Sequence, residues 1–187
     1  MGLTFLSSQT ASTSSSIDFT SGIDGTYNEY LFTIVNFKPV TDEKRLCFQV
    51  DTGTNTAYDQ TITSTAFSAG QSQSAGWTDL NYEANMDQKE GDDALQPISY
   101  SGESNTYADM TVSGELKLYA PNDGTYVKHF VGSTNVKYTN NNTDAQTYSI
   151  SLHTAGYVNI TTALTRVRFA SESGSIFTGT FTLYGVG

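Results

Sequence analysis

The sequence predicts an all-β protein, an antiparallel β-sandwich of jelly-roll-like form with about eight to eleven strands. Three observations support this class. Side chains alternate in character along much of the chain, turn-forming residues separate the alternating runs, and no comparably regular helical pattern interrupts them. A period of two is typical of extended strands, whose successive side chains point to opposite faces. The 187 residues fit one large domain, and about a quarter of them are Ser or Thr.

Residues 1–16 are rich in Ser and Thr, above all from residue 7 onward, and have little to bury. Leu3, Phe5 and Leu6 precede this Ser/Thr run, and such apolar residues are unusual in a free tail. We therefore expect an N-terminal arm that docks through these three side chains, either on its own sheet or on another subunit. Residues 17–187 form the sandwich domain that this arm precedes.

Four strands are predicted in the first part of the domain, over residues 16–20, 29–37, 44–51 and 59–69. Asp24-Gly25 gives a turn signal after the first strand, and Pro39 ends the second because proline cannot donate a hydrogen bond to the ladder. Residues 29–37 carry apolar side chains on both faces, which predicts a central strand that is covered on both sides.

The pattern weakens over residues 70–109, which we interpret as an irregular acidic insertion. Short strands could form around residues 77–82 and 95–100, and one helical turn around residues 85–93. Eight acids and only Lys89 as a base lie here: Asp79, Glu83, Asp87, Glu90, Asp92, Asp93, Glu103 and Asp109. We favour a solvated loop; a divalent-cation site is the alternative, although the spacing matches no calcium-binding loop of the EF-hand type.

Regular strands return over residues 111–119, 125–138 and 148–152, with turns at residues 121–124 and 140–142. The last two runs, residues 163–170 and 176–184, are the most regular in the chain, and residues 171–175 separate them. We predict that they form a terminal β-hairpin. Arg166 and Arg168 share one face of the first run, and we expect acids of a neighbouring strand to face them; a salt bridge between subunits is the alternative.

The composition argues against several classes of function. The net charge is −10, and the sequence shows no basic patch of the kind that binding to nucleic acid normally requires. No apolar run is long enough to span a membrane, and the first residues do not resemble a signal peptide. Cys47 is the only cysteine and lies within a predicted strand, so we interpret it as a small buried side chain.

The sequence contains no catalytic motif that we can identify: no nucleophile elbow, phosphate-binding loop or His-x-x-x-His pair. His129 and His153 lie in separate predicted strands, and we interpret both as structural rather than as metal ligands. We therefore expect no enzyme activity, no catalytic residues, no metal and no cofactor.

Carbohydrate binding is the alternative that the residues leave open. Aromatic side chains lie among polar neighbours in the irregular region, and such rings are candidates to face a glycan: Trp77, Tyr82, Tyr100 and Tyr107. The competing interpretation is that these rings close the ends of the sandwich.

Several segments, taken together, resemble a family of small virion proteins of tailed bacteriophages that are abundant in marine phage sequences. The segments are residues 16–24, 30–36, 41–42, 126–130, 155–159, 161–163, 166–169, 173–174 and 183–186. They cover about half of the chain. The family commonly has Asn after the Ser-Gly pair, where this chain has Ser175. Residues 70–109 do not match well.

The resemblance implies a virion structural protein. We favour a capsid decoration, or cement, protein on the outer shell of the phage particle, made in the host cytoplasm. Its implied partners are the major capsid protein and further copies of itself, as a homotrimer. The alternative is a tail-fibre or receptor-binding protein that recognises glycans on the host surface. A glycan-degrading enzyme is a third hypothesis, which the absence of catalytic motifs disfavours.

Overall fold

The structure is a computed structural model that describes residues 2–54, 57–74, 76–89, 95–101, 109–139 and 147–187. These residues form an antiparallel β-sandwich of an eight-stranded and a four-stranded sheet, as the alternating pattern predicts. They contain no helix, and so no helix long and apolar enough to cross a membrane. They hold twelve strands, one more than the upper end of the predicted range, since the segment expected to be an arm forms a strand.

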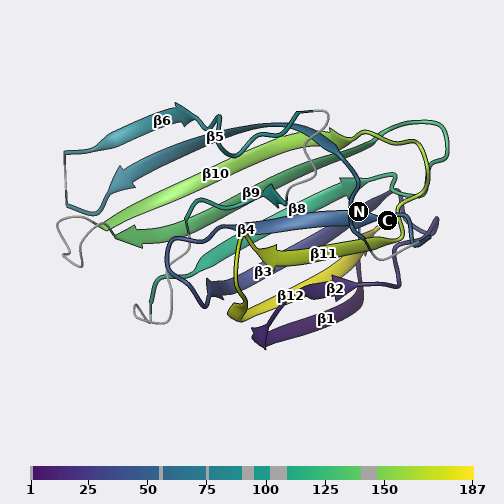
Figure 1. Cartoon of the computed structure of the whole chain (residues 1–187), viewed down its shortest axis with the longest axis horizontal. Coiled ribbons are helices and arrows are strands. Elements are labelled where there is room, and N and C mark those ends of the chain that lie inside the picture. Colours follow the sequence, from purple (N-terminus) through teal and green to yellow (C-terminus); the bar gives the residue numbers. More distant parts are fainter. Residues whose placement is uncertain (1, 55–56, 75, 90–94, 102–108, 140–146) are drawn as a thin grey trace.

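The large sheet lies behind the small sheet in Figure 1. Its strands, in spatial order, are β1 (Leu3–Ser14), β12 (Ile176–Val186), β3 (Glu29–Pro39), β8 (Val112–Tyr119), β9 (Lys128–Thr139), β10 (Thr147–Val158), β5 (Ile62–Ser72) and β6 (Thr78–Tyr82). The small sheet contains β2 (Ile17–Phe19), β11 (Arg166–Ser171), β4 (Leu46–Asp51) and β7 (Gln96–Pro97).

The core is rich in phenylalanine because both sheets turn aromatic rings inward. Phe169 of the small sheet lies 5.4 Å from Phe32 and 5.2 Å from Phe181, both in the large sheet, measured between ring centroids. Phe48 and Phe130 make a similar contact between the two sheets at 4.9 Å. All five side chains are fully buried. These contacts hold the two layers together.

The predicted terminal hairpin is wrong, although both of its strands exist. β11 pairs with β2 and β4 in the small sheet, whereas β12 pairs with β1 and β3 in the large sheet. The connecting residues therefore cross from one layer to the other, with Gly174 at a φ of 74°. Alternation identifies each strand but not its neighbour, and here the two strands bury their apolar faces against each other across the core.

The prediction that residues 29–37 form a central strand covered on both faces is confirmed in its position and only partly in its cover: β3 lies between β12 and β8, and Leu31 is buried on the outer face, but the cover does not extend along the strand. Tyr30, Phe32 and Ile34 face the core, while Val35 is exposed on the other face. A β-bulge lies between Ile34 and Phe37, where Asn36 has a φ of 56°. The extra residue returns Phe37 to the core side, so apolar residues occur at both parities although the strand buries mainly one face.

Residues 95–101 contain β7, the edge strand of the small sheet, and residues 83–89 extend the cover of the large sheet past that edge. Met86 packs against Ala66 and Leu152, and Ile98 is fully buried. The main-chain N–H of Ile98 donates to Leu46 of β4 at 2.9 Å. The segment expected to be a solvated insertion therefore contributes to the core where it is described. Residues 84–86 form a turn but no helix, and Glu90, Asp92, Asp93 and Glu103 lie outside the described residues.

Candidate functional site

The expected arm lies along the chain's own large sheet as β1. It pairs antiparallel with β12, from Leu3 opposite Val186 to Ser14 opposite Ile176. Leu3 and Phe5 are 59% and 61% exposed, but Leu6 is half-buried against the core. The register shifts between Phe5 and Ser7, and this bulge turns Leu6 inward. Only two of the three predicted arm residues are therefore available to a partner.

The outer face of the large sheet, which points away from the small sheet, carries an apolar band that begins at these residues. We define the apolar band as the apolar members of two adjacent cross-strand rows: Leu3, Phe5, Leu31, Val131, Ala155, Tyr184 and Val186. Leu31 is buried within it, and the ion-paired Glu29 and Lys117 lie in the same rows, so the exposed apolar part is concentrated on β1 and β12. The ring of Phe5 lies 6.2 Å from that of Tyr184, edge to face. Neighbouring rows on β1 and β12 carry mainly Ser and Thr, with a hydroxyl contact of 3.0 Å between Ser8 and Thr182.

Three of the four predicted glycan-facing aromatic residues are described, and they do not form one group. Tyr82 is 64% exposed on the outer face, where it pairs with Phe67 and donates a hydrogen bond to Asp87 that raises its pKa. Trp77 and Tyr100 lie on the inner side of the sheet. Tyr107 lies outside the described residues.

Trp77 and Tyr100 are linked by two further rings. Trp77 contacts Tyr148 edge to face at 5.0 Å, Tyr148 stacks on Tyr138 at 6.4 Å, and Tyr138 contacts Tyr100 at 5.9 Å, all between centroids. With Ile150 these rings line a hollow of about 200 Å³, which we call the aromatic pocket. The sequence analysis did not select Tyr138 and Tyr148, although they stand on either side of a predicted turn and are direct cross-strand partners.

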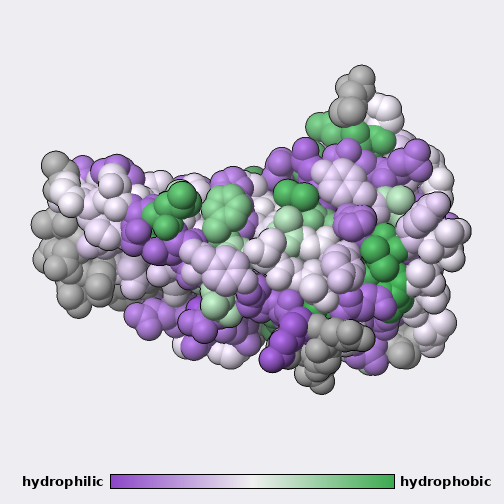
Figure 2. Space-filling view, turned by 90° about the horizontal axis from the view of Figure 1, so that it is seen from above, coloured by the Kyte–Doolittle hydropathy of each residue, from purple (hydrophilic) through white to green (hydrophobic). Residues whose placement is uncertain are grey.

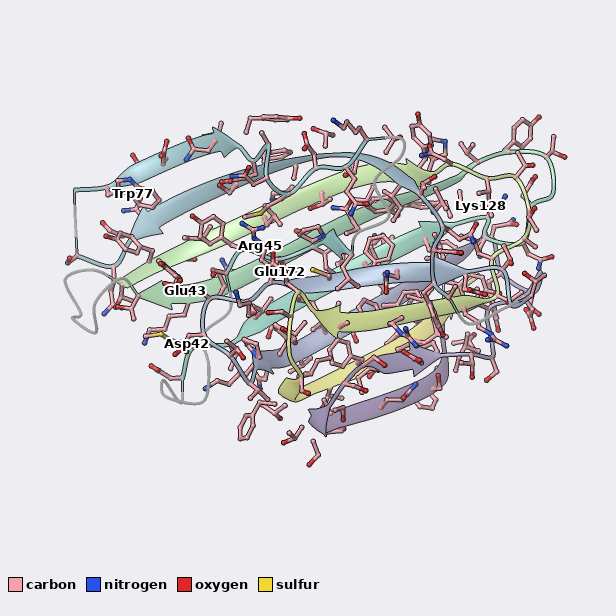
Figure 3. All side chains as sticks on the ribbon, in the orientation of Figure 1. Asp42, Glu43, Arg45, Trp77, Lys128 and Glu172 are labelled. Atoms are coloured by element: carbon pink, nitrogen blue, oxygen red, sulfur yellow. The ribbon has the colours of Figure 1, made fainter. Side chains whose placement is uncertain are left out.

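Gly70 determines how closely the indole approaches the sheet. A Cβ atom at this position would lie 2.3 Å from Cη2 of Trp77, so any other residue would displace the ring. The turn from β5 to β6 returns Trp77 to this place: its N–H donates to Oγ of Ser72 at 3.3 Å, and its carbonyl accepts from the Ser72 N–H at 2.9 Å. Figure 3 shows Trp77 near the edge of the large sheet, apart from Arg45 and Glu172.

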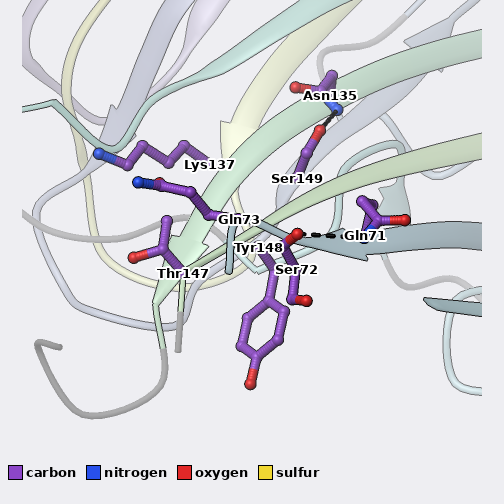
Figure 4. A pocket seen from close by; sticks show the side chains of 8 residues that line it. All are labelled: Gln71, Ser72, Gln73, Asn135, Lys137, Thr147, Tyr148 and Ser149. Carbon is purple, nitrogen blue, oxygen red and sulfur yellow. Dashed lines mark hydrogen bonds between the residues drawn. The ribbon is translucent and has the colours of Figure 1, made fainter. Parts of the chain in front are cut away.

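A second hollow, of about 270 Å³, lies on the outer face of the large sheet, on the opposite side from the aromatic pocket, and Tyr148 belongs to the lining of both. We call it the polar pocket, because amide and hydroxyl side chains dominate its lining: Gln71, Ser72, Gln73, Asn135, Lys137, Thr147 and Ser149 (Figure 4). Asn135 donates to Oγ of Ser149 at 2.9 Å, and the amine of Lys137 bonds to Asp109. Amide and hydroxyl groups present both donors and acceptors to a ligand.

A third hollow, of about 330 Å³, shares Tyr100 and Tyr138 with the aromatic pocket. Its polar lining includes Glu43, Glu83 and Arg45. Arg45 bonds to Glu172 at 3.3 Å, so its charge is already compensated.

The two histidines that the sequence analysis weighed as metal ligands each pack against an aromatic ring. His153 stacks on Phe67 at 5.1 Å and His129 contacts Tyr157 at 6.0 Å. Their positions on β10 and β9 are separated by four residues along the strands, roughly 13 Å. Across the part of the chain that the structure describes, no group of His, Cys, Asp and Glu could hold a metal ion.

Two buried groups with reactive chemistry take no part in the lining of the three hollows described above. Cys47 is fully buried, and burial raises the pKa of its thiol. Lys128 is also fully buried, and burial lowers the pKa of its amine, which donates to the carbonyls of Tyr126 and Thr161, the latter at 3.0 Å. Both side chains lie within the packed structure and offer no nucleophile to solvent.

The expected partner of Arg168 is confirmed. β11 pairs with β2 so that Arg168 stands opposite Asp18, and two hydrogen bonds of 2.8 and 2.7 Å join the guanidinium to the carboxylate. Burial raises the pKa of Asp18, but hydrogen bonds from Arg168 and Ser16 outweigh this effect and hold it below its ordinary value. The ring of Tyr58 lies 3.8 Å below the guanidinium carbon.

Comparisons with known protein families, with curated proteins and with solved structures gave no match to this chain.

Proposed function

We propose that the protein is a structural component of a bacteriophage virion, a capsid decoration protein that binds the major capsid protein on the outer surface of the head. The segments that resemble the phage virion family support the class. The proposed role rests mainly on one surface of the molecule, formed by the free edge of β1 and by the apolar band that begins on it. We call it the assembly surface.

The edge of β1 is unusual for an isolated protein. β1 ends the strand order of the large sheet, and among the described strands no other strand pairs with its second edge. Proteins commonly protect such edges with Lys, with Pro or with short strands. This strand has twelve residues, and no ionisable side chain or proline occurs from Met1 to Ile17. An edge of this kind favours pairing with a strand of another subunit.

The charge distribution favours the same surface. The chain carries a net charge of −10, so copies on a crowded shell repel one another in general. β1 contributes nothing to that repulsion because its side chains are uncharged. Leu3 and Phe5 lie at the start of this edge and are more than half exposed, so they can lose apolar surface to a partner. We place the contacts to the capsid and to other copies of a homotrimer here.

Substitution of both exposed apolar residues tests the role. Leu3→Ser with Phe5→Ser should reduce occupancy on purified capsids at least tenfold, because burial of the two side chains contributes about 2–3 kcal/mol. Deleting the segment is less informative, since it would also expose the edge of β12. Leu80→Ser is the matched control: Leu80 is 71% exposed, on β6 at the opposite edge of the sheet. Undiminished occupancy of the double variant would contradict the proposed surface.

Copy number distinguishes this role from that of a tail-fibre or receptor-binding protein. A shell protein is present in hundreds of copies per virion, and a fibre tip in a few to a few dozen. Quantitative protein staining of purified particles measures this directly. A low copy number together with loss of host adsorption would replace the decoration role by the receptor-binding role.

A further inference from the structure

We propose that the aromatic pocket and the third hollow form one groove that binds an arginine-bearing segment of a partner protein, with the guanidinium against the rings of Tyr100 and Tyr138 and paired with a carboxylate of the third hollow. This inference goes beyond the capsid role and does not depend on it. The groove lies on the inner side of the large sheet, which carries the small sheet, whereas the assembly surface lies on the edge of β1 and on the outer face.

The two hollows lie on the same side of the large sheet. Tyr138 and Tyr148 are direct cross-strand partners, and they alternate in step with the buried residues Val136 and Ile150, so their rings point to the inner side. Tyr100 packs against both buried clusters of that side. The rings of Tyr100 and Tyr138 contact each other at 5.9 Å and line both hollows. The hollows, of about 200 and 330 Å³, therefore adjoin across this pair of rings, and together they reach the ~300–1,000 Å³ typical of ligand sites.

The third hollow carries an excess of negative charge beside these rings. Glu43, Glu83 and Arg45 belong to its lining, and Arg45 is paired with Glu172 at 3.3 Å. Neither Glu43 nor Glu83 forms an ion pair within the described part of the chain. Burial raises the pKa of Tyr100, and the charge of Glu83 raises it further, so this carboxylate acts on the ring. A cation that enters the hollow meets two uncompensated carboxylates and an aromatic surface.

The chain uses the same combination of groups to hold one of its own arginines. The guanidinium carbon of Arg168 lies 3.8 Å from the centre of the Tyr58 ring, and the guanidinium donates two hydrogen bonds, of 2.8 and 2.7 Å, to Asp18. A planar guanidinium can stack on a ring and bond a carboxylate through its edge at the same time, which a lysine amine cannot do. In the groove, two tyrosine rings and two glutamates offer these groups to a partner.

The aromatic pocket accommodates an apolar residue next to the arginine. Trp77 is 38% exposed, but it is held in place because it lies against Gly70 and contacts Tyr148 edge to face at 5.0 Å. A ring that is positioned by its neighbours and still faces solvent can bind a ligand with little loss of conformational freedom. The net charge of −10 attracts basic segments from a distance. The expected ligand is therefore a segment in which an apolar residue adjoins an arginine.

Short peptides with blocked ends test the groove by calorimetry and by the fluorescence of Trp77, the only tryptophan of the chain. The purified protein is titrated with Leu-Arg-Leu, with Leu-Lys-Leu, with Leu-citrulline-Leu, whose side chain has a similar shape but no charge, and with neutral oligosaccharides of glucose and N-acetylglucosamine. We expect the arginine peptide to bind at least tenfold more tightly than the citrulline peptide, to bind more tightly than the lysine peptide, and to change the emission of Trp77. Absence of saturable binding by the arginine peptide overturns the proposal. Equal affinity for the citrulline or lysine peptide, or saturation with the oligosaccharides alone, does so too.

Variants locate the bound side chain. Glu83→Gln removes a charge but keeps an acceptor for the hydroxyl of Ser68, so it should weaken the arginine peptide about tenfold and leave the citrulline peptide unchanged. Tyr138→Leu, which keeps an apolar side chain, should weaken the arginine peptide several-fold. Glu115→Gln is the matched control, since it removes the same charge from the outer face of β8, and its affinity should equal that of the wild type. Equal weakening by Glu83→Gln and Glu115→Gln would indicate general attraction to an acidic protein and overturn the site. Circular dichroism confirms that each variant is folded.

Discussion

Phe169 tests whether the last two strands face each other across the core. Its side chain is fully buried and contacts Phe19, Phe32 and Phe181, at centroid distances of 6.2, 5.4 and 5.2 Å. Phe169→Ala should lower the free energy of unfolding by about 3–5 kcal/mol, because it removes a buried ring and leaves a cavity. Domains of this size have total stabilities of about 5–15 kcal/mol, so the variant should be close to unfolding at 37 °C. Phe169→Leu, which keeps most of the volume, should cost less than about 1.5 kcal/mol.

The assay is urea unfolding followed by circular dichroism and by the fluorescence of Trp77. A double-mutant cycle with Phe181→Leu and Phe169→Leu should give a coupling energy of about 0.5–1.5 kcal/mol, since the two rings are in contact. Tyr126→Ala, at a highly exposed position, is the control and should change stability by less than about 0.5 kcal/mol. A cost below about 1 kcal/mol for Phe169→Ala, or additive leucine substitutions, would refute the proposed packing of β11 against β12.

Three further predictions concern stability and reactivity. Asp18→Asn should cost about 1–2 kcal/mol at pH 7, because it weakens the paired hydrogen bonds to Arg168. Since the folded pKa of Asp18 is lowered, the stabilisation is present above the ordinary Asp pKa of about 3.9 and is lost as the pH falls through the folded value, so unfolding curves of variant and wild type should converge in acid and not at neutral pH. Cys47 should resist thiol reagents at pH 8 until denaturant is added, as burial raises its pKa; rapid labelling of the native protein would contradict its position in the core. Gly114→Ala should destabilise by about 1–3 kcal/mol, because the new Cβ would lie 2.2 Å from a main-chain oxygen of β9, while Gly132→Ala, with its nearest neighbour at 3.5 Å, serves as the neutral control.

The apolar surface on the β6 side provides a useful contrast to the proposed assembly surface. Seen from above, over β5 and β6, hydrophobic side chains form separate patches within a hydrophilic surface (Figure 2). Leu80 is highly exposed there, but it follows Asp79 and lies two residues before Tyr82, which bonds to Asp87. Charged neighbours of this kind protect an edge from association. β1 has no such neighbours along its length.

Alternation predicted most strands because each one buries a single face. The choice of neighbours could not be predicted in the same way: residues 171–175 fit either a hairpin or a crossing between layers, and only the completed core selects the crossing. The bulge at Asn36 could not be predicted either: Asn tolerates a positive φ, but apolar residues on both sides of it continue the strand pattern. The pairing of Arg168 with an acid was predictable, because charged residues on one strand face favour opposite charges on the next strand.

The candidate site was predicted in part. Trp77 and Tyr100 were identified as exposed aromatic residues in a polar region, but their connection depends on Tyr138 and Tyr148, which belong to regular strands. Their inward direction follows from the same alternation as that of Val136 and Ile150, two residues away. What the sequence does not show is that the small sheet ends before it reaches them, so that rings with a core pattern become the lining of a pocket.

Hydrogen exchange of the β1 amides, compared between the free protein and the protein bound to phage heads, tests the proposed assembly surface most directly. In the free protein, amides of β1 that point away from β12 should exchange rapidly because they face solvent, while those bonded to β12 are protected. On the particle we predict that the solvent-facing amides between Leu3 and Ser14 become protected as well. Unchanged exchange along β1, with new protection confined to another part of the chain, would contradict the assignment of this edge to assembly.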